Sequence, residues 1–136
     1  MKSDRFVLIF MFLVVNGFSS DNFQIPVDSV KQFMSVEKHQ YMFKKAQEGG
    51  ALEKGRESFK DMCKKEEDVS KCECFNRELD LVSDTLFFYE SIVAYQRFLK
   101  KVKAKKIGDE KLYQELINKE KFVFSLSKFL ESRCDL

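Results

Sequence analysis

Helix-breaking residues are scarce in this sequence of 136 residues. Proline occurs once, at Pro26, and after the first 19 residues glycine occurs only at positions 49, 50, 55 and 108. The long segments between them are rich in Lys, Glu, Leu and Phe, which favours helices. No segment shows a clear alternation of apolar and polar residues with the period of a strand. The sequence therefore predicts an all-α protein.

The motifs of common catalytic sites are also missing. The chain has no Gly-x-Ser-x-Gly nucleophile motif and no Gly-x4-Gly-Lys phosphate loop. Its single histidine, His39, stands between Lys38 and Gln40 and is expected on a solvated helix face. The acidic pair Glu66-Glu67 belongs to a charged turn. We therefore expect a protein that is not an enzyme and binds no cofactor or metal, whereas an enzyme would require a cleft of clustered polar groups.

Only one long apolar run exists, Phe6–Val15. It follows the basic residues Lys2 and Arg5, and the small residues Gly17 and Ser19 come after it. This is the layout of a secretory signal peptide, with cleavage expected after Ser19. The run of ten residues is too short to cross a bilayer, which takes about 20 residues. The alternative is an N-terminal anchor that is not cleaved.

The remaining segment, residues 20–136, has the length of one domain. It is expected to form a single helical, disulfide-containing domain that does not insert stably into a membrane. No Asn-x-Ser/Thr sequon occurs, which favours a bacterial periplasmic protein over a secreted eukaryotic one, and both stay open. We expect an exported protein, in the bacterial periplasm or secreted.

Charge of one sign is not in large excess. The chain carries 24 Lys and Arg against 22 Asp and Glu, a net charge of +2. Loss of residues 1–19 removes Lys2, Arg5 and Asp4 and leaves +1. A net charge this small predicts no general attraction to nucleic acid or to a membrane surface.

Breaker positions and apolar spacing predict four helices. Their expected ranges are 28–48, 51–65, 70–106 and 109–133. Asp68 or Ser70 is expected to cap the third helix, and Gly108 in the left-handed conformation is expected to close it. Together they predict a small four-helix bundle with a long central third helix, stapled by two disulfides.

The third predicted helix is apolar on two sides. One stripe consists of Phe75, Leu79, Val82, Leu86 and Val93, and the other of Leu81, Phe88, Ile92, Tyr95, Leu99 and Val102. A helix of this kind is normally packed between neighbours, so both stripes are expected to be buried. The phenylalanines are expected to fill the core. Alternatively, they form a cage for a small apolar ligand.

The four cysteines predict two disulfides, because an even number in an exported chain normally pairs. Residues two apart on a helix point about 200° away from each other, so Cys72 and Cys74 should not bond to each other. The favoured pairs are Cys63–Cys72 and Cys74–Cys134, and Cys63–Cys74 with Cys72–Cys134 stays open. A four-cysteine zinc site or a redox-active Cys-x-x-Cys pair would need other spacings.

The favoured pairing creates a conflict of distance. A hairpin that turns at residue 108 leaves Cys134 opposite residue 82, about 12 Å from Cys74 at about 1.5 Å per residue. The third helix would have to end earlier, near Val102, or the last residues would have to extend.

The strongest charge feature is the run RFLKKVKAKK, residues 97–106, near the end of the third helix. Cations there interact favourably with the helix macrodipole. Alternatively, they form a patch that docks an acidic protein or an anionic envelope surface, and nucleic acid is not expected because few aromatic residues are interleaved. The candidate partner-binding residues are Arg97, Lys100, Lys101, Lys103, Lys105 and Lys106.

These patterns favour a non-enzymatic factor of the cell envelope or secretome that binds another protein. A stapled helical bundle suits blocking or inhibiting a partner, in the manner of an immunity protein. The alternative function is a carrier for a small apolar ligand. The identity of the partner and the oligomeric state are not predicted.

Overall fold

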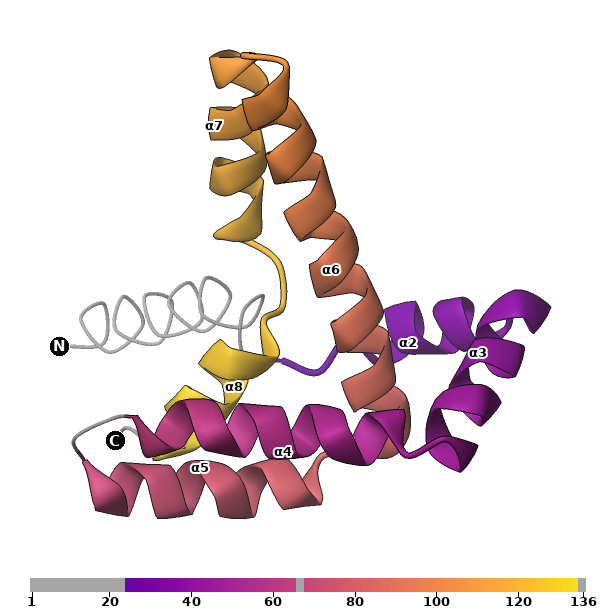
Figure 1. The fold of residues 1–136 in the computed structure, drawn as a ribbon, viewed down its shortest axis with the longest axis vertical. Coiled ribbons are helices and arrows are strands. Elements are labelled where there is room, and N and C mark those ends of the chain that lie inside the picture. The colour runs from indigo at the N-terminus through magenta and orange to yellow at the C-terminus, as the bar shows by residue number, and fades with distance from the viewer. Residues whose placement is uncertain (1–23, 66–67, 135–136) are drawn as a thin grey trace, which may run out of the picture.

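The computed structural model describes residues 24–65 and 68–134. Over these ranges the chain forms seven helices and no strand, so the all-α class is confirmed (Figure 1). The predicted signal peptide lies outside the described residues. The helices are α2 (Val27–Met34), α3 (Glu37–Glu48), α4 (Ala51–Lys64), α5 (Val69–Leu81), α6 (Asp84–Lys106), α7 (Glu110–Glu120) and α8 (Leu126–Cys134).

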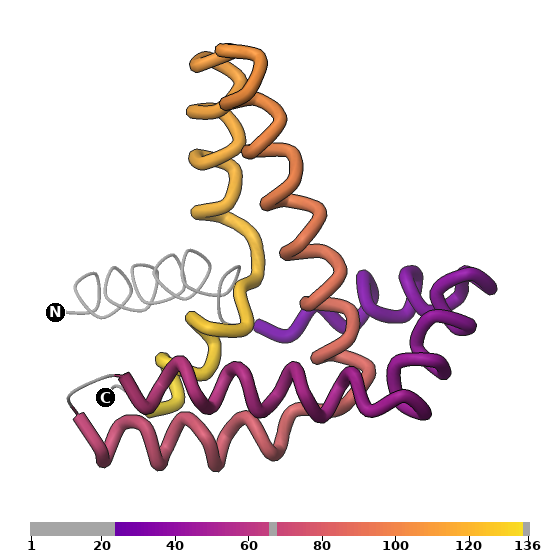
Figure 2. Tube along the Cα trace, viewed as in Figure 1, coloured from indigo at the N-terminus to yellow at the C-terminus, as the bar shows by residue number. Residues whose placement is uncertain are grey.

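The helices make a base and a projecting arm (Figures 1 and 2). In the base, α4 and α5 run antiparallel side by side, α8 packs on α5, and α2 and α3 lie at one end. Helix α6 rises from the base, and its distal half pairs with α7. We define the arm as residues 95–123. It stands away from the base, so the molecule is not a closed bundle.

The core lies where α6 leaves the base. Its buried residues come from four helices and from two segments between helices, and partly buried phenylalanines such as Phe33, Phe43, Phe59, Phe75 and Phe129 pack around them. The buried cluster consists of Leu52, Leu79, Val82, Leu86, Phe87, Phe88, Phe124, Leu126 and Leu130. Most phenylalanines of the base therefore fill the core, as the sequence predicts.

Three of the four predicted helices are broken, so the four-helix prediction was wrong in this respect. The first break separates α2 from α3 at Ser35–Val36, where Val36 adopts an extended backbone. Side chains bind the carbonyls at the end of α2: Ser35 Oγ donates to Gln32 O at 2.6 Å, and Gln40 Nε2 donates to Met34 O at 2.9 Å. These bonds replace the helical hydrogen bonds lost at the break.

The second break divides the predicted long third helix into α5 and α6. Val82 is extended, and the Ser83 side chain accepts a hydrogen bond from Leu86 N at 3.1 Å, as an N-cap residue does. Arg56 of α4 donates to Leu79 O and to Val82 O, both at 2.7 Å. A cap on one side and an arginine on the other therefore stabilise a turn that the apolar spacing alone does not reveal.

The third break lies between α7 and α8, at residues 121–125. It contains neither proline nor glycine. Phe124 is buried here, and Leu126, the first residue of α8, donates its backbone N–H to the Glu90 carboxylate at 3.3 Å. A tertiary contact with α6 thus fixes the start of α8.

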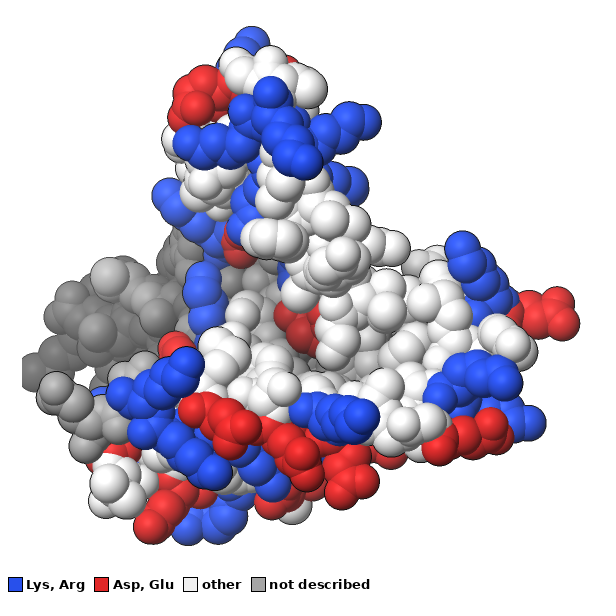
Figure 3. Space-filling view, viewed as in Figure 1, with Lys and Arg blue, Asp and Glu red and all other residues white. Residues whose placement is uncertain are grey.

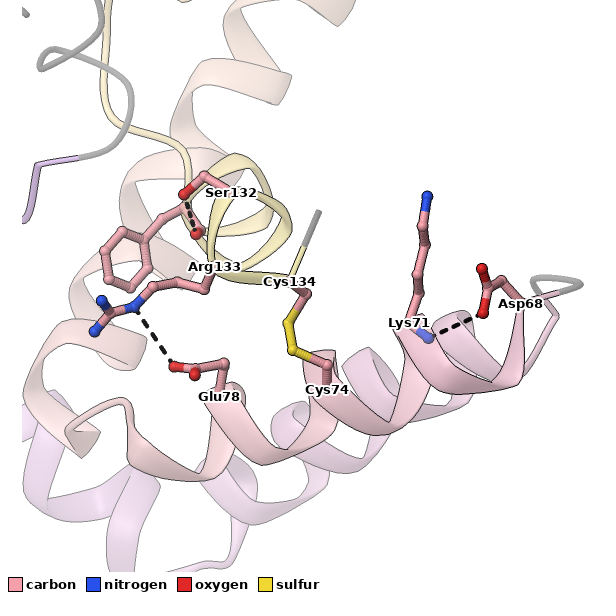
Figure 4. The surroundings of a disulfide bond; sticks show 8 residues. Asp68, Lys71, Cys74, Glu78, Ser132, Arg133 and Cys134 are labelled. Atoms are coloured by element: carbon pink, nitrogen blue, oxygen red, sulfur yellow. Dashed lines mark hydrogen bonds and ion pairs between the residues drawn. A yellow bond between two sulfur atoms is a disulfide. The ribbon is translucent and has the colours of Figure 1, made fainter. Parts of the chain in front are cut away.

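These breaks remove the distance conflict between Cys74 and Cys134. Since α8 is separate from α7, it turns back and packs on α5, where Cys74 and Cys134 form a disulfide with a Cα–Cα distance of 5.7 Å (Figure 4). Neither of the two remedies expected from the sequence is needed, because α6 continues to Lys106 and Cys134 still belongs to a helix. Gly108 has the predicted left-handed conformation, with φ of 74°.

Candidate functional site

The second apolar stripe of the predicted third helix is covered only in part. Near the base, Phe88 contacts Phe33 of α2 and Phe43 of α3, with ring centroids 6.0 and 5.3 Å apart. Ile92, one turn further along α6, also packs against the core. The face of α6 that carries these residues therefore points toward α2 and α3.

Beyond Ile92 the same face of α6 is exposed. Tyr95, Phe98 and Leu99 have 60, 54 and 45% of their surface open to solvent. We call these three residues the α6 stripe. The prediction that both sides of this helix are buried was wrong here, because α7 packs on the opposite side, where Ala104 is only 1% exposed.

The six basic residues proposed as a partner site separate into two groups. Arg97 and Lys101 point toward acids, since Arg97 lies 3.3 Å from Glu90 and Lys101 lies 3.0 Å from Glu120 of α7. Lys101 joins α6 to α7, and Arg97 pairs within α6, so both are poor candidates for binding a partner.

The other four basic residues, Lys100, Lys103, Lys105 and Lys106, are exposed on the distal half of α6. Lys105 Nζ lies 4.6 Å from the ring centre of Tyr113. Within the described part of the chain, Lys100, Lys103 and Lys106 have no acidic partner within ion-pair distance. Figure 3 shows Lys and Arg side chains as blue surface gathered over the upper arm.

The chain is nearly neutral overall, but positive and negative charges are unevenly distributed between the arm and the rest of the protein. The arm carries nine Lys or Arg against four Asp or Glu, whereas the rest of residues 20–136 carries 13 basic against 17 acidic residues. In Figure 3 the base shows red and blue side chains intermixed, and uncharged white surface runs from α6 down toward α2 and α3. The arm alone is basic enough to attract an acidic partner.

Sequence reasoning missed Glu90, which lies at the foot of the arm and is only 7% exposed. Burial raises the pKa of this carboxyl, and the nearby Arg97 guanidinium and the Leu126 N–H oppose that rise. Glu90 also lines a hollow of about 300 Å³ between α6, α7 and α8. The signal in the sequence was an acid within the apolar segment Phe87–Val93.

A second charged group ties α4 to the start of α6. Arg56 Nη2 lies 2.8 Å from Asp84 Oδ1, and its guanidinium lies over the Phe87 ring at 5.0 Å. The hydrogen bond from Arg56, together with one from Gln47, lowers the pKa of Asp84. This arrangement is structural, because both terminal nitrogens of Arg56 donate to groups at the α5–α6 junction.

The expectation of a solvated His39 was wrong. Its ring stacks on Phe33 with centroids 3.8 Å apart, and its Nδ1 lies 2.7 Å from Phe33 O. His39 therefore stabilises the turn between α2 and α3.

The remaining cysteines lie together at the other end of the base. Cys63 of α4 and Cys72 of α5 lie close to each other. Both line a hollow of about 780 Å³, together with Phe59, Met62 and Phe75. Cys72 is buried and Cys74 is half-buried, which agrees with the prediction that they face different sides of one helix. Beside the disulfide, Arg133 pairs with Glu78 at 3.5 Å (Figure 4).

Within residues 24–65 and 68–134, no three His, Cys, Asp or Glu side chains come together as metal ligands. None of the helices described there is both long and apolar enough to span a membrane. Comparison with protein-family models, curated proteins and solved structures finds no match to the chain.

Proposed function

We propose that this chain is an exported, non-enzymatic protein that binds and inhibits another protein through its arm. The observation that carries the proposal is the α6 stripe: Tyr95, Phe98 and Leu99 are exposed side by side on a helix that projects from the base. Large exposed apolar patches on soluble proteins commonly mark contact surfaces. Aromatic residues are also enriched in the parts of interfaces that dominate binding.

The position of the stripe supports the same function. It continues a face of α6 that, nearer the base, already packs against two other helices. A partner helix that covers Tyr95 and Leu99 would extend this packing by about two turns. The predicted signal peptide supports export, and the Cys74–Cys134 disulfide suits an oxidising compartment.

Paired substitutions test this function in the native host. The double variant Tyr95→Ser/Phe98→Ser should lose a partner that co-purifies with the unmodified chain. Tyr41→Ser is the matched control, because Tyr41 on α3 is 63% exposed and lies outside the arm. A chain that purifies without any partner, or a partner kept by the double variant, would contradict the proposal.

We also propose that Cys63 and Cys72 form the second predicted disulfide in an oxidising compartment. Each thiol loses one hydrogen to the oxidant, either oxygen or a disulfide exchange enzyme of that compartment. Their near approach and the shared hollow support the bond. Peptide mapping without reductant should recover the linked peptides. Full alkylation of both thiols in protein taken from the exported compartment would show that the bond does not form.

The carrier function remains the second candidate, and the 780 Å³ hollow at Phe59, Met62 and Phe75 supports it. The hollow borders the core, because Phe59 and Phe75 pack against the core and also line the hollow. Native mass spectrometry of the exported protein tests it. A bound lipid that is lost on Phe75→Ala substitution would favour the carrier, and protein without adducts would count against it.

A further inference from the structure

We infer that the partner of the arm presents an amphipathic helix flanked by acidic residues, an inference that rests on the proposed protein-binding function. The first argument is charge. Lys103 and Lys106 follow Leu99 by four and seven residues, so at about 100° per residue they continue its face toward the tip of the arm. Lys100 lies beside them, and none of the three has an acidic partner within the described chain.

The partner therefore has to combine apolar side chains for the stripe with carboxylates for the lysines. An α-helix with apolar residues at three- and four-residue spacing and Asp or Glu beside them has this pattern. Opposite charges around an apolar contact also direct the approach of the partner and fix its register.

The second argument is shape, and it distinguishes a helix from a membrane. The stripe lies on the side of α6 that points toward α2 and α3, as the contacts of Phe88 with Phe33 and Phe43 show. Figure 1 shows α2 and α3 projecting from the base below the arm. A flat bilayer brought toward the stripe would meet α2 and α3 first. A helix, a rod about 10 Å in diameter, can instead lie along the stripe beside α2 and α3.

The third argument concerns self-association. If the stripes of two copies packed antiparallel around Phe98, Lys100 and Lys103 of one copy would lie opposite Gln96 and Val93 of the other, which carry no charge. Lys106 would lie opposite Glu90, which is only 7% exposed and already contacts Arg97. Such a dimer gives the lysines no exposed acidic partner, so a different, acidic chain satisfies this surface better.

A peptide selection tests the inference with the purified full chain. The probe is a phage-displayed library of helical peptides with apolar residues at three- and four-residue spacing and randomised flanking positions. Selected peptides should be enriched in Asp and Glu at the flanks, and added salt should weaken their binding. Tyr95→Ser/Phe98→Ser should abolish binding, and Lys100→Glu/Lys103→Glu/Lys106→Glu should weaken it about tenfold.

Two control variants test whether the position of the lysines and the folding of the arm explain this result. Lys38→Glu/Lys44→Glu/Lys54→Glu reverses three exposed lysines outside the arm and should leave binding unchanged. If the arm triple variant loses its helical circular dichroism, the corresponding Lys→Gln variant replaces it, because it removes the positive charges without introducing acids beside the macrodipole.

Each other outcome contradicts a defined part of the account. Peptides that need Tyr95 and Phe98 but show no acidic enrichment would overturn the acidic partner and leave the protein-binding function intact. A selection in which no peptide depends on the stripe would overturn both. Stronger, stripe-dependent binding to vesicles of phosphatidylglycerol and phosphatidylethanolamine would identify the arm as a membrane surface and overturn the helix partner. Concentration-dependent dimerisation that is lost on Phe98→Ser would identify a second copy of this chain as the partner and overturn the acidic helix.

Discussion

Glu90 shows how one buried side chain connects the arm to the base. Its Oε1 atom lies 3.3 Å from Arg97 Nη2 and accepts from Leu126 N at 3.3 Å. One carboxylate thus contacts a neighbour on α6 and the first residue of α8. Its surroundings favour the protonated form, because the loss of hydration outweighs these two interactions.

This raised pKa predicts how stability depends on pH. Where the folded-state pKa of a carboxyl lies above that of the unfolded chain, the folded state binds more protons between the two values. The free energy of unfolding should therefore rise as pH falls through the folded-state pKa of Glu90 toward the ordinary value of 4.5. Glu90→Gln should flatten this part of the profile, measured by urea unfolding at a series of pH values. A profile unchanged by the substitution would contradict the assignment.

Asp84 should act in the opposite direction at lower pH. Arg56 holds the pKa of Asp84 below its ordinary value of 3.8. Its contribution to stability is therefore present above pH 3.8 and is lost as the pH falls through the lowered value. Asp84→Asn should remove that acidic decline and leave the Glu90 region of the profile unchanged. The same urea series measures both effects. If Asp84→Asn changed only the Glu90 region of the profile, the assignment of the acidic decline to Asp84 would be contradicted.

Arg56 predicts a large loss of stability on substitution. Its guanidinium satisfies the carbonyls of Leu79 and Val82 at the end of α5, and Leu79 has no exposed surface. Arg56→Ala should lower the free energy of unfolding by about 2–4 kcal/mol, because Val82 O loses its arginine donor and Leu79 O keeps only the backbone N–H of Val82. Arg77→Ala, at an exposed position of α5, is the control and should cost less than about 0.5 kcal/mol. Equal effects of the two would contradict the role of Arg56.

At the scale of elements, the sequence predicts most helix starts and stops but not the breaks. Asp109 caps α7 by accepting from Leu112 N at 3.0 Å, and α4 ends within one residue of its predicted end. The break at Ser83 was missed because a helical apolar period continues across it. Its stabilisation comes partly from Arg56, 27 residues earlier in the chain, and no local pattern contains that contact.

The cap at the start of α6 gives a prediction for this break. Ser83→Ala removes the side chain that accepts from Leu86 N, so it should cost about 1 kcal/mol. Ser70→Ala, an exposed position in the first turn of α5, is the control and should have little effect. Thermal unfolding measures both. A Ser83→Ala protein as stable as the unmodified chain would show that Arg56 alone maintains the turn.

The disulfide predicts how firmly α8 is held. Cys74 and Cys134 are 60 residues apart in sequence, so their bond restricts a long loop of the unfolded chain. Cys74→Ser/Cys134→Ser should lower the free energy of unfolding by about 4 kcal/mol in the chain-entropy description. Urea unfolding measures the loss. In a Cys63→Ser/Cys72→Ser background, added reductant should destabilise the protein that keeps Cys74 and Cys134 but not the one that lacks them. A loss below about 1 kcal/mol would mean that α8 is held mainly by Leu126 and Leu130, which are buried in the core.

At the scale of the whole molecule, the features that the sequence could not predict lie in the arm. Apolar periodicity shows that the face of Phe88, Ile92, Tyr95 and Leu99 favours burial, but it does not show what covers the face. The chain covers Phe88 with α2 and α3, packs Ile92 against the core, and leaves Tyr95 and Leu99 exposed. The separation of charge was also hidden, because a net charge of +2 conceals a basic arm on a more acidic remainder.

The central claim is that the α6 stripe contacts another protein, and site-specific photo-crosslinking tests it most directly. A photoreactive phenylalanine analogue is placed at Tyr95 in one protein and at Tyr41 in another, since both side chains are similarly exposed. Both proteins are expressed in the native host and irradiated in their exported compartment. The account predicts one discrete crosslinked protein from position 95 and none from position 41. Equal crosslinking from both positions, or none from position 95, would contradict it.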